Sequence, residues 1–353
     1  MTHLSACTLA AALACLMTWQ AEIAAADDPV AMRIESLLVA PAHTPAVVVV
    51  VKNLGANAYQ GTIELRGPEG WLLEPAEQPI ELAGEETGRM RFLVRRGMAN
   101  EENCYVLTAT AVGVGSGSPV AYQQQLAVAS APHFRPAIDG DAADWNDAIP
   151  VTWSTGGLAT SVSTFWNRKS FSILVAVEEK DWIAGSPGDG APVDAVQIAI
   201  SPRGAITGSS AEAPSTRLEL LLMGDDARRG RCFLLAKPGM KLAETQADRE
   251  LESLACPDVE LVVTRDGSVT RYECAIPFQL LREQIRPSEG REFQLSVLVH
   301  DPDGTGIRDW GEAAGLWPWQ RNRLAWSRWP GAKWGPEPPL DCTTPWGMCS
   351  SKY

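Results

Sequence analysis

The sequence is poor in basic residues and in histidine. It has 30 Lys and Arg residues against 43 Asp and Glu, a formal net charge of −13, and only 4 His in 353 residues. Nucleic-acid phosphates and anionic lipid surfaces are bound by basic proteins, so neither is expected as a partner. An acidic surface is compatible with a neutral ligand such as a sugar.

Catalytic motifs are also missing. The chain has no GxSxG nucleophile elbow, no HExxH zinc motif and no phosphate-binding P-loop. The lack of a CxxC pair gives no indication of a zinc ribbon or a thioredoxin-type site. Two carboxylates could support glycoside hydrolysis, but among 43 acidic residues such pairs arise by chance. We therefore predict that the protein is not an enzyme.

The apolar runs are short. Residues 9–17 are mostly Ala and Leu, and three alanines follow at 24–26. This pattern is typical of a secretory signal peptide, here residues 1–26, and the run is too short to span a bilayer. A lipoprotein anchored through Cys15 is the alternative. We expect no transmembrane segment after signal removal and a secreted, periplasmic or cell-surface location.

Six cysteines remain beyond the signal peptide, and an oxidising compartment would permit disulfides among them. Cys342 and Cys349 enclose a short Pro/Gly-containing loop and are the preferred pair. Cys232 is expected to pair with Cys256 or with Cys274. The sixth, Cys104, is expected to be a small buried hydrophobe.

The first half of the chain contains short β-branched runs separated by Gly and Pro turns. Strands are expected over 47–51, 62–66, 89–94 and 105–112, a spacing typical of a β-sandwich, which we place at 30–131. The segments VVVVVKNLG, PEGWLLEP and CYVLTATA resemble the Ig-like domains associated with secreted glycosidases, sometimes called NEW3. That resemblance implies architecture rather than chemistry.

The second half, 133–340, predicts a larger β-sandwich. Its expected strands are 161–166, 171–178, 195–200, 217–223, 232–235, 261–264, 271–276 and 293–299. A short helix is expected within 277–285, the polar insertion 236–258 is expected to be a loop, and 341–353 a C-terminal tail. The predicted fold class is therefore all-β, with two β-sandwich domains.

Several motifs of the second half follow a family order. They are IDGDAADW, TFWNRKSFSILVAVEEKDW, VDAVQIAISP, RYECAIPF, FQLSVLVHDPDG and RLAWSRW. This region resembles the family 9 carbohydrate-binding modules and their DOMON-like relatives. The resemblance implies non-catalytic binding of a polysaccharide or oligosaccharide. It also implies glycan-degrading enzymes as partners, because both domain types resemble glycosidase accessories.

Tryptophan is concentrated near the C-terminus, where seven of the 13 Trp lie between 310 and 346. The flat indole face covers the C–H face of a pyranose at little rotamer cost. Packing of the loop by its own indoles is the alternative for this cluster. Trp145, Trp153 and Trp166, in or beside early strands, are expected in the core.

The family resemblance also implies particular site residues. In sugar-binding members two Trp clamp the saccharide, and a Glu and an Arg lie on neighbouring strands. Arg217 matches the Arg position, Gln197 stands at the Glu position, and Trp329 matches one clamp position. The other clamp position falls near Ala191, which is not aromatic, and Trp182 is the nearest Trp. The predicted carbohydrate-binding residues are Trp182, Gln197, Arg217, Trp326, Trp329 and Trp334.

Residues 301–312 match the twelve-residue calcium loop, with oxygen donors at its positions 1, 3, 5, 9 and 12 and glycine at position 6. An Asp/Gly-rich hairpin turn would give the same pattern, and Arg308 adds a positive charge. Structural calcium is the one cofactor expected. Its predicted ligands are Asp301, Asp303, Thr305, the backbone of Ile307, Asp309 and Glu312.

Two other functions remain open. The protein could be a structural or adhesive cell-envelope protein that uses the second sandwich as a scaffold. A DOMON-type haem domain would need an axial ligand, for which His300 and Met223 are the candidates. The preferred prediction is an exported carbohydrate-binding protein that accompanies glycoside hydrolases.

Overall fold

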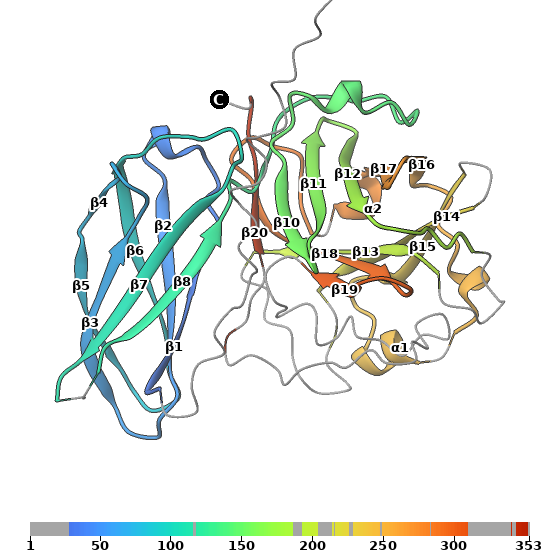
Figure 1. The fold of residues 1–353 in the computed structure, drawn as a ribbon. Coiled ribbons are helices and arrows are strands. Elements are labelled where there is room, and N and C mark those ends of the chain that lie inside the picture. The colour runs from blue at the N-terminus through green and yellow to red at the C-terminus, as the bar shows by residue number, and fades with distance from the viewer. Residues whose placement is uncertain are drawn as a thin grey trace, which may run out of the picture.

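The structure is a computed structural model of two β-sandwiches that lie side by side (Figure 1). It confirms the predicted all-β class. Among the described residues, no helix is long and apolar enough to cross a membrane. The structure describes residues 28–115, 118–185, 193–203, 214, 216–225, 229–247, 249–282, 284–309, 340 and 344–351.

The first sandwich packs a sheet of order β1-β2-β6-β4 on a sheet of order β5-β3-β7-β8. Its interior is apolar because alternate residues of each strand point inward, as in β3 and β7. The elements are β1 (Val30–Ile34), η1 (Pro41–His43), β2 (Ala46–Asn53), β3 (Tyr59–Arg66), β4 (Leu72–Glu74), β5 (Glu77–Leu82), β6 (Thr87–Arg96), β7 (Tyr105–Gly113) and β8 (Val120–Leu126).

The second sandwich packs a sheet of order β10-β11-β12-β17-β16 on one of order β15-β14-β13-β18-β20-β9, with β19 paired to β18. Apolar side chains from both sheets meet in one large core. The strands are β9 (Ser130–Ala131), β10 (Val151–Thr155), β11 (Leu158–Trp166), β12 (Ser170–Glu178), β13 (Ala195–Pro202), β14 (Leu218–Gly224), β15 (Gly230–Ala236), β16 (Glu260–Asp266), β17 (Val269–Pro277), β18 (Glu292–Asp301), β19 (Gly306–Asp309) and β20 (Thr344–Met348).

The expected core tryptophans and the expected short helix are found in this sandwich. Trp145, Trp153 and Trp166 are at most 7% exposed, as expected of core side chains. The expected short helix is α2, within 277–285. The insertion 236–258 was expected to be a loop, but it holds one short helix and one 3-10 turn. Glu244 caps the start of the short helix, because its carboxylate accepts the Lys241 backbone N–H at 3.1 Å. The helical elements are η2 (Ala142–Trp145), α1 (Leu242–Gln246), η3 (Leu251–Leu254) and α2 (Phe278–Leu281).

The expected C-terminal tail contains a core strand. In Figure 1, β20 is the dark red strand at the boundary between the two sandwiches. It pairs antiparallel with β18 and parallel with β9, and Trp346 is 1% exposed. The prediction of a tail was wrong here because Thr344–Met348 follows a proline-rich stretch and is too short to show a period.

The connection between the sandwiches serves both cores. Leu126 and Val128 pack into the first core, whereas Ala127, Ala129 and Ala131 pack into the second. The alternation follows from the extended backbone, which sends successive side chains to opposite sides. The two domains therefore share this short segment rather than a free linker.

Cys232, Cys256, Cys274 and Cys349 are free thiols, and Cys104, which was expected to be buried, is half-buried. Of the two partners considered for Cys232, the structure brings Cys256 opposite it. The Cys256 backbone N–H donates to the Cys232 carbonyl at 2.8 Å, and the two thiols are hydrogen-bonded. Cys274 is buried in the same core, and Cys342 lies outside the described residues.

Candidate functional site

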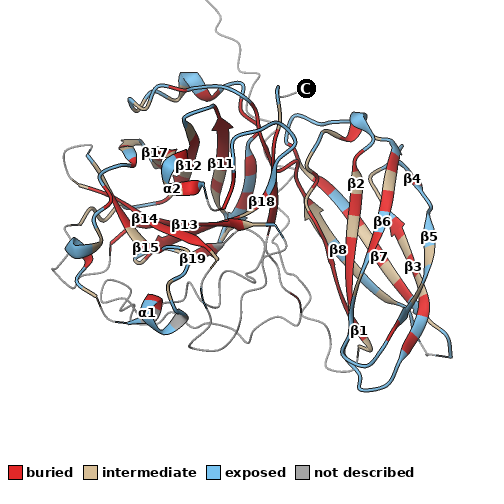
Figure 2. Cartoon of the chain, turned by 180° about the vertical axis from the view of Figure 1, so that it is seen from behind, coloured by how far each residue is buried: buried red, intermediate tan, exposed pale blue. Residues whose placement is uncertain are grey.

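Three neighbouring strands, β14, β13 and β18, carry the candidate site. Their residues are buried on both faces of the sheet, which Figure 2 shows as nearly continuous red. Val196 and Ile198 point into the large core. Because side chains alternate along a strand, Ala195 and Gln197 point to the opposite face, which we call the outer face.

A polar cluster lies within the outer face. Glu219 is 0% exposed and accepts hydrogen bonds from the side-chain amide of Gln197 and from Arg217 Nε, the latter at 2.8 Å. His300 Nε2 lies 3.0 Å from Gln197 Oε1. That oxygen can only accept, so the His300 ring donates. Gln197, Arg217, Glu219 and His300 thus form one connected network.

The four residues of the network carry no net charge among themselves, although the cationic Arg249 stands beside them. Arg217 and Glu219 form an ion pair in which both side chains are at most 1% exposed. Burial lowers the pKa of His300 to about 3, so its imidazole is uncharged near neutral pH. Arg249 stands near Glu219, and burial lowers the pKa of its guanidinium. A neutral imidazole that donates to an amide is placed to orient it rather than to accept a substrate proton.

The structure brings together two of the predicted site residues and adds two. Gln197 lies in β13 and Arg217 immediately before β14, and they share Glu219 as a partner. Sequence reasoning did not select Glu219, and it considered His300 only as a candidate haem ligand, not as part of a sugar site. The signal for Glu219 was present, because it stands two residues after Arg217 and a strand places such residues on the same face.

Trp182 lies elsewhere. It packs against the large core, on the side of the β13–β14 sheet opposite to Gln197 and Arg217. Its indole lies 2.6 Å from where a Cβ on Gly224 would be, so only glycine fits beneath the ring. The structure therefore separates Trp182 from the polar cluster. Three further predicted contacts lie outside the described residues, namely Trp326, Trp329 and Trp334.

The predicted calcium loop is a hairpin turn between β18 and β19. Thr305 donates through its backbone N–H and its hydroxyl to Asp301 Oδ2, at 2.9 and 2.7 Å. Arg308 is 0% exposed, pairs with the same oxygen and donates to the Thr305 hydroxyl at 2.6 Å. Ile307 pairs with His300 in the ladder. The Asp309 side chain and Glu312 lie outside the described part of the chain.

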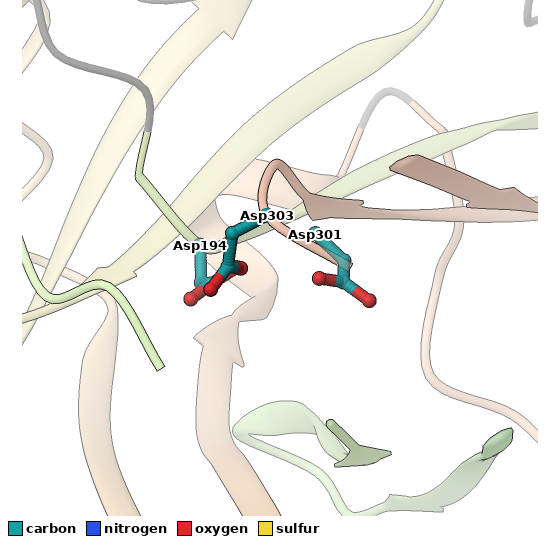
Figure 3. A group of neighbouring side chains, drawn as sticks. All are labelled: Asp194, Asp301 and Asp303. Carbon is teal, nitrogen blue, oxygen red and sulfur yellow. The ribbon is translucent and has the colours of Figure 1, made fainter. Parts of the chain in front are cut away.

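Asp301 and Asp303, two of the predicted calcium ligands, lie near a third aspartate, Asp194, which is not part of the twelve-residue loop. Asp194, immediately before β13, offers a carboxylate oxygen within 4.8 Å of one each from Asp301 and Asp303 (Figure 3). Burial, together with the nearby carboxylates of Glu179, Asp303 and Asp301, raises the pKa of Asp194 to about 8. Burial likewise raises the pKa of neighbouring Glu179 to about 7. For Asp301, burial is outweighed by the bonds from Arg308 and Thr305, which lower its pKa.

Two cavities lie away from these side chains. One of about 690 Å³ is lined by apolar residues and by charged ones that include Arg135, Lys169 and Asp258. The other, of about 340 Å³, lies between the sandwiches beside Asn103 and Trp145. Of the predicted carbohydrate-binding residues that the structure describes, Trp182, Gln197 and Arg217, none lines either cavity.

No family model and no curated protein matches the chain. Among solved structures, it is similar to a family 9 carbohydrate-binding module from Caldicellulosiruptor kristjanssonii in complex with glucose, with a TM-score of 0.40 and 12% identity over 62% of this chain and 94% of that one. The cellotriose complex of a family 9 module from the same organism gives 0.39 and 12% over 63% and 93%. The chaperone YadV gives 0.23 and 8% over 80% and 98%.

Proposed function

We propose that the protein is an exported, non-catalytic carbohydrate-binding protein whose sugar site is built on the outer face of β14, β13 and β18. One observation carries the proposal. Gln197 and Arg217, selected from the sequence by family resemblance, are joined through a single carboxylate, that of Glu219 in β14. Sugar hydroxyls are recognised by a few polar side chains whose orientation other residues fix in advance.

The charge of the cluster supports an uncharged ligand. The Arg217–Glu219 pair cancels internally, and His300 is neutral near pH 7. A neutral sugar would gain hydrogen bonds from such a cluster without adding a buried charge. In the proposal, Trp329 supplies the stacking face, with Trp326 and Trp334 beside it in the sequence. Glycan-degrading enzymes are the proposed partners.

A specific observation favours a second candidate function. Gln197 and Arg217 are each 1% exposed, as befits a network that holds a sheet together. A structural or adhesive protein of the cell envelope would use the cluster in this way. The two candidates differ in whether the full chain binds a glycan.

Binding to a panel of soluble and insoluble polysaccharides tests the proposal. The full chain and its Trp329→Ala variant are compared, with glucose and cellotriose as competing soluble sugars. We expect retention on one glycan class and at least ~30-fold weaker binding of the variant, the effect of removing a central aromatic contact.

The control is Trp182→Phe, which alters a Trp on the opposite side of the sheet and should leave binding unchanged. Binding that survives Trp329→Ala but is lost in Trp182→Phe would move the site to the other side of the sheet. If no glycan retains the full chain, the carbohydrate proposal fails and the structural function stands.

A further inference from the structure

Where the two sandwiches meet (Figure 1), the cavity of about 340 Å³ is lined by residues of both. On one side lie Asn100 and Glu101, in the segment that precedes β7. On the other lie Trp145, which ends η2, and residues that follow it. Pockets that bind small molecules have volumes of roughly 300–1,000 Å³ and are frequent at domain interfaces, whereas one water occupies about 30 Å³. The place and the size of this cavity are those of a ligand site.

Hydrogen bonds hold the boundary around the cavity in place. Asn103, part of the lining, is 8% exposed. Its side-chain oxygen accepts the Val128 backbone N–H at 2.8 Å, and its amide donates to the carbonyls of Val128 and Pro150 at 3.1 and 2.9 Å. Val128 lies in the connection between the sandwiches and Pro150 immediately before β10. One side chain of the first sandwich thus fixes the second, and a pocket formed in advance binds with little further ordering of the protein.

The inner walls of the cavity are aromatic and aliphatic. Trp145 and Leu174 of the second sandwich and Tyr105 of the first are each at most 9% exposed. Two further rings hold the aromatic walls in position. Phe165 packs on Trp145 with ring centroids 5.2 Å apart, and Trp71 packs on Tyr105 at 5.3 Å. Walls of this kind favour a flat apolar group, which gains free energy by leaving water.

A single buried hydroxyl group stands in this wall without a partner in the described chain. Ser163, in β11, lines the cavity and is 8% exposed, and its side chain makes no hydrogen bond to a described residue. Its neighbour Val162 points into the large core, so Ser163 points to the opposite side of the sheet. The Tyr105 hydroxyl differs, because it accepts the Asn100 backbone N–H at 3.3 Å. A serine hydroxyl can both donate and accept, so a hydroxyl of a ligand would satisfy it.

The charges around the cavity indicate an uncharged ligand. Among the described residues that line it, only Glu101 carries a charge, and this residue is exposed at the rim, as is Asn146. An anion would therefore meet a carboxylate and no compensating cation. A cation would have to leave water for apolar walls.

We propose that this cavity binds a small uncharged molecule that combines an aromatic ring with a hydroxyl group. The ring lies against Trp145 and Leu174, and the hydroxyl bonds to Ser163. The site is separate from the outer face of β14, β13 and β18, and the proposal does not depend on whether the protein binds sugar there. A ligand in this place contacts both sandwiches and joins them more firmly.

Titration of the full chain with benzyl alcohol, followed through the indole N–H resonance of Trp145 by NMR, tests the site. We expect a saturable shift with a Kd on the order of 1 mM, as is usual for so small a probe. Toluene, which lacks the hydroxyl, should bind ~2–10-fold more weakly. Benzoate, which carries a negative charge, should bind at least ~10-fold more weakly than benzyl alcohol.

Two variants separate the hydroxyl contact from the cavity itself. Ser163→Ala should weaken benzyl alcohol ~2–10-fold and leave toluene unchanged, a difference that a merely loosened fold would not produce. Ala99→Phe places a ring at an exposed position of the rim and should abolish binding of both probes. The matched control is Ala121→Phe, an exposed alanine of β8 outside the lining, which should bind both probes like the unaltered protein.

Several outcomes would overturn the proposal. The site is wrong if the full chain shows no saturable binding of benzyl alcohol, or if Ala99→Phe binds it unchanged. The ligand class is wrong if Ser163→Ala weakens both probes equally, if benzoate binds as tightly as benzyl alcohol, or if glucose displaces the probe. Trp329→Ala should leave the titration unchanged, so a failure of the proposed sugar site is recognised separately. A weakened titration in that variant would place the probe at the sugar site instead.

Discussion

The two sandwiches bury charge in different ways. In the first, the strands of both sheets bury one face around an apolar core, and the described buried charges, Arg33 and Glu35, lie at its border, where Glu35 also pairs with Arg203 of the second sandwich. In the second, β13, β14 and β18 are buried on both faces, and the outer face holds the buried Arg217–Glu219 pair.

This difference indicates which of the two sandwiches carries residues that serve more than the stability of the fold. An apolar interior is sufficient to hold a sandwich together, as the first domain illustrates. A buried ion pair adds little net stability, because removing two charges from water costs about as much as their attraction returns. The polar network of the second sandwich is therefore poorly explained by stability alone, which agrees with a role in recognition.

The largest effect is expected from Glu219→Ala. The change leaves the Arg217 guanidinium buried without its carboxylate and removes the acceptor of the Gln197 amide. Loss of one partner of a buried pair typically costs about 3–5 kcal/mol in the free energy of unfolding. Urea denaturation followed by Trp fluorescence measures it.

Glu64→Ala is the matched control, because Glu64 pairs with the exposed Arg66 on the first sandwich and should cost no more than ~1 kcal/mol. The double variant Arg217→Met/Glu219→Leu should recover most of the loss, since it leaves no buried charge. A Glu219→Ala effect as small as that of Glu64→Ala would contradict the contrast between the sandwiches.

A purely apolar change in the first sandwich gives the next effect. Leu107, in β7, is 0% exposed, and Leu107→Ala should cost about 2–5 kcal/mol through lost contacts and the cavity left behind. Hydrogen exchange should speed up in β2, β3 and β7 while the amides of β13 keep their protection. Equal acceleration in both sandwiches would show that they unfold as one unit.

A smaller effect concerns pH. Glu273 accepts the Trp145 indole N–H at 2.6 Å and the Gly140 N–H at 2.7 Å, and burial raises its pKa above the usual carboxyl value. The folded state then holds a proton that the unfolded state has already released. Stability contributed by this group is therefore lost as the pH rises from the ordinary carboxyl pKa to the raised one.

Glu273→Gln cannot ionise, so its stability should fall less steeply with pH over that window. The difference in slope is at most about 1.4 kcal/mol per pH unit. Urea midpoints of both proteins across the window measure it, and the other shifted carboxyls cancel in the comparison. Parallel curves would mean that Glu273 is ionised in the folded protein at the same pH as in the unfolded one.

Strands were predicted correctly where a run of residues was clearly β-branched or clearly alternated between apolar and polar side chains. The expected strand 47–51 lies within β2, and 293–299 within β18, because β-branched runs and alternation follow directly from the pleat. The short strands β4, β9 and β19 were not found, since two to four residues carry no period. Their pairing depends on residues far away in the chain. Four longer strands, β1, β5, β8 and β10, were missed as well. In β8, for example, three consecutive Gln stand where a β-branched or alternating run would have been the signal.

The candidate sites were predictable in part for the same reason. Gln197 and Arg217 were selected from family motifs, and strand register brought them together. The burial of the cluster could not be read from the sequence, because it depends on which face of the sheet is covered. Asp194 was missed as a companion of Asp301 because the two are adjacent only through the pairing of β13 with β18.

The position of β20 determines when the second sandwich can complete its fold during synthesis. This strand lies between β18 and β9 and inserts Trp346 into the core of the second sandwich. Ribosomes deliver the chain from its N-terminus, so the first sandwich can close as soon as β8 has emerged. The second sandwich cannot close before β20 has been synthesised up to residue 348. Until then, the edge of β9 and part of the core remain exposed. During that interval the nascent chain exposes an unpaired strand edge, the kind of surface that other chains can pair with.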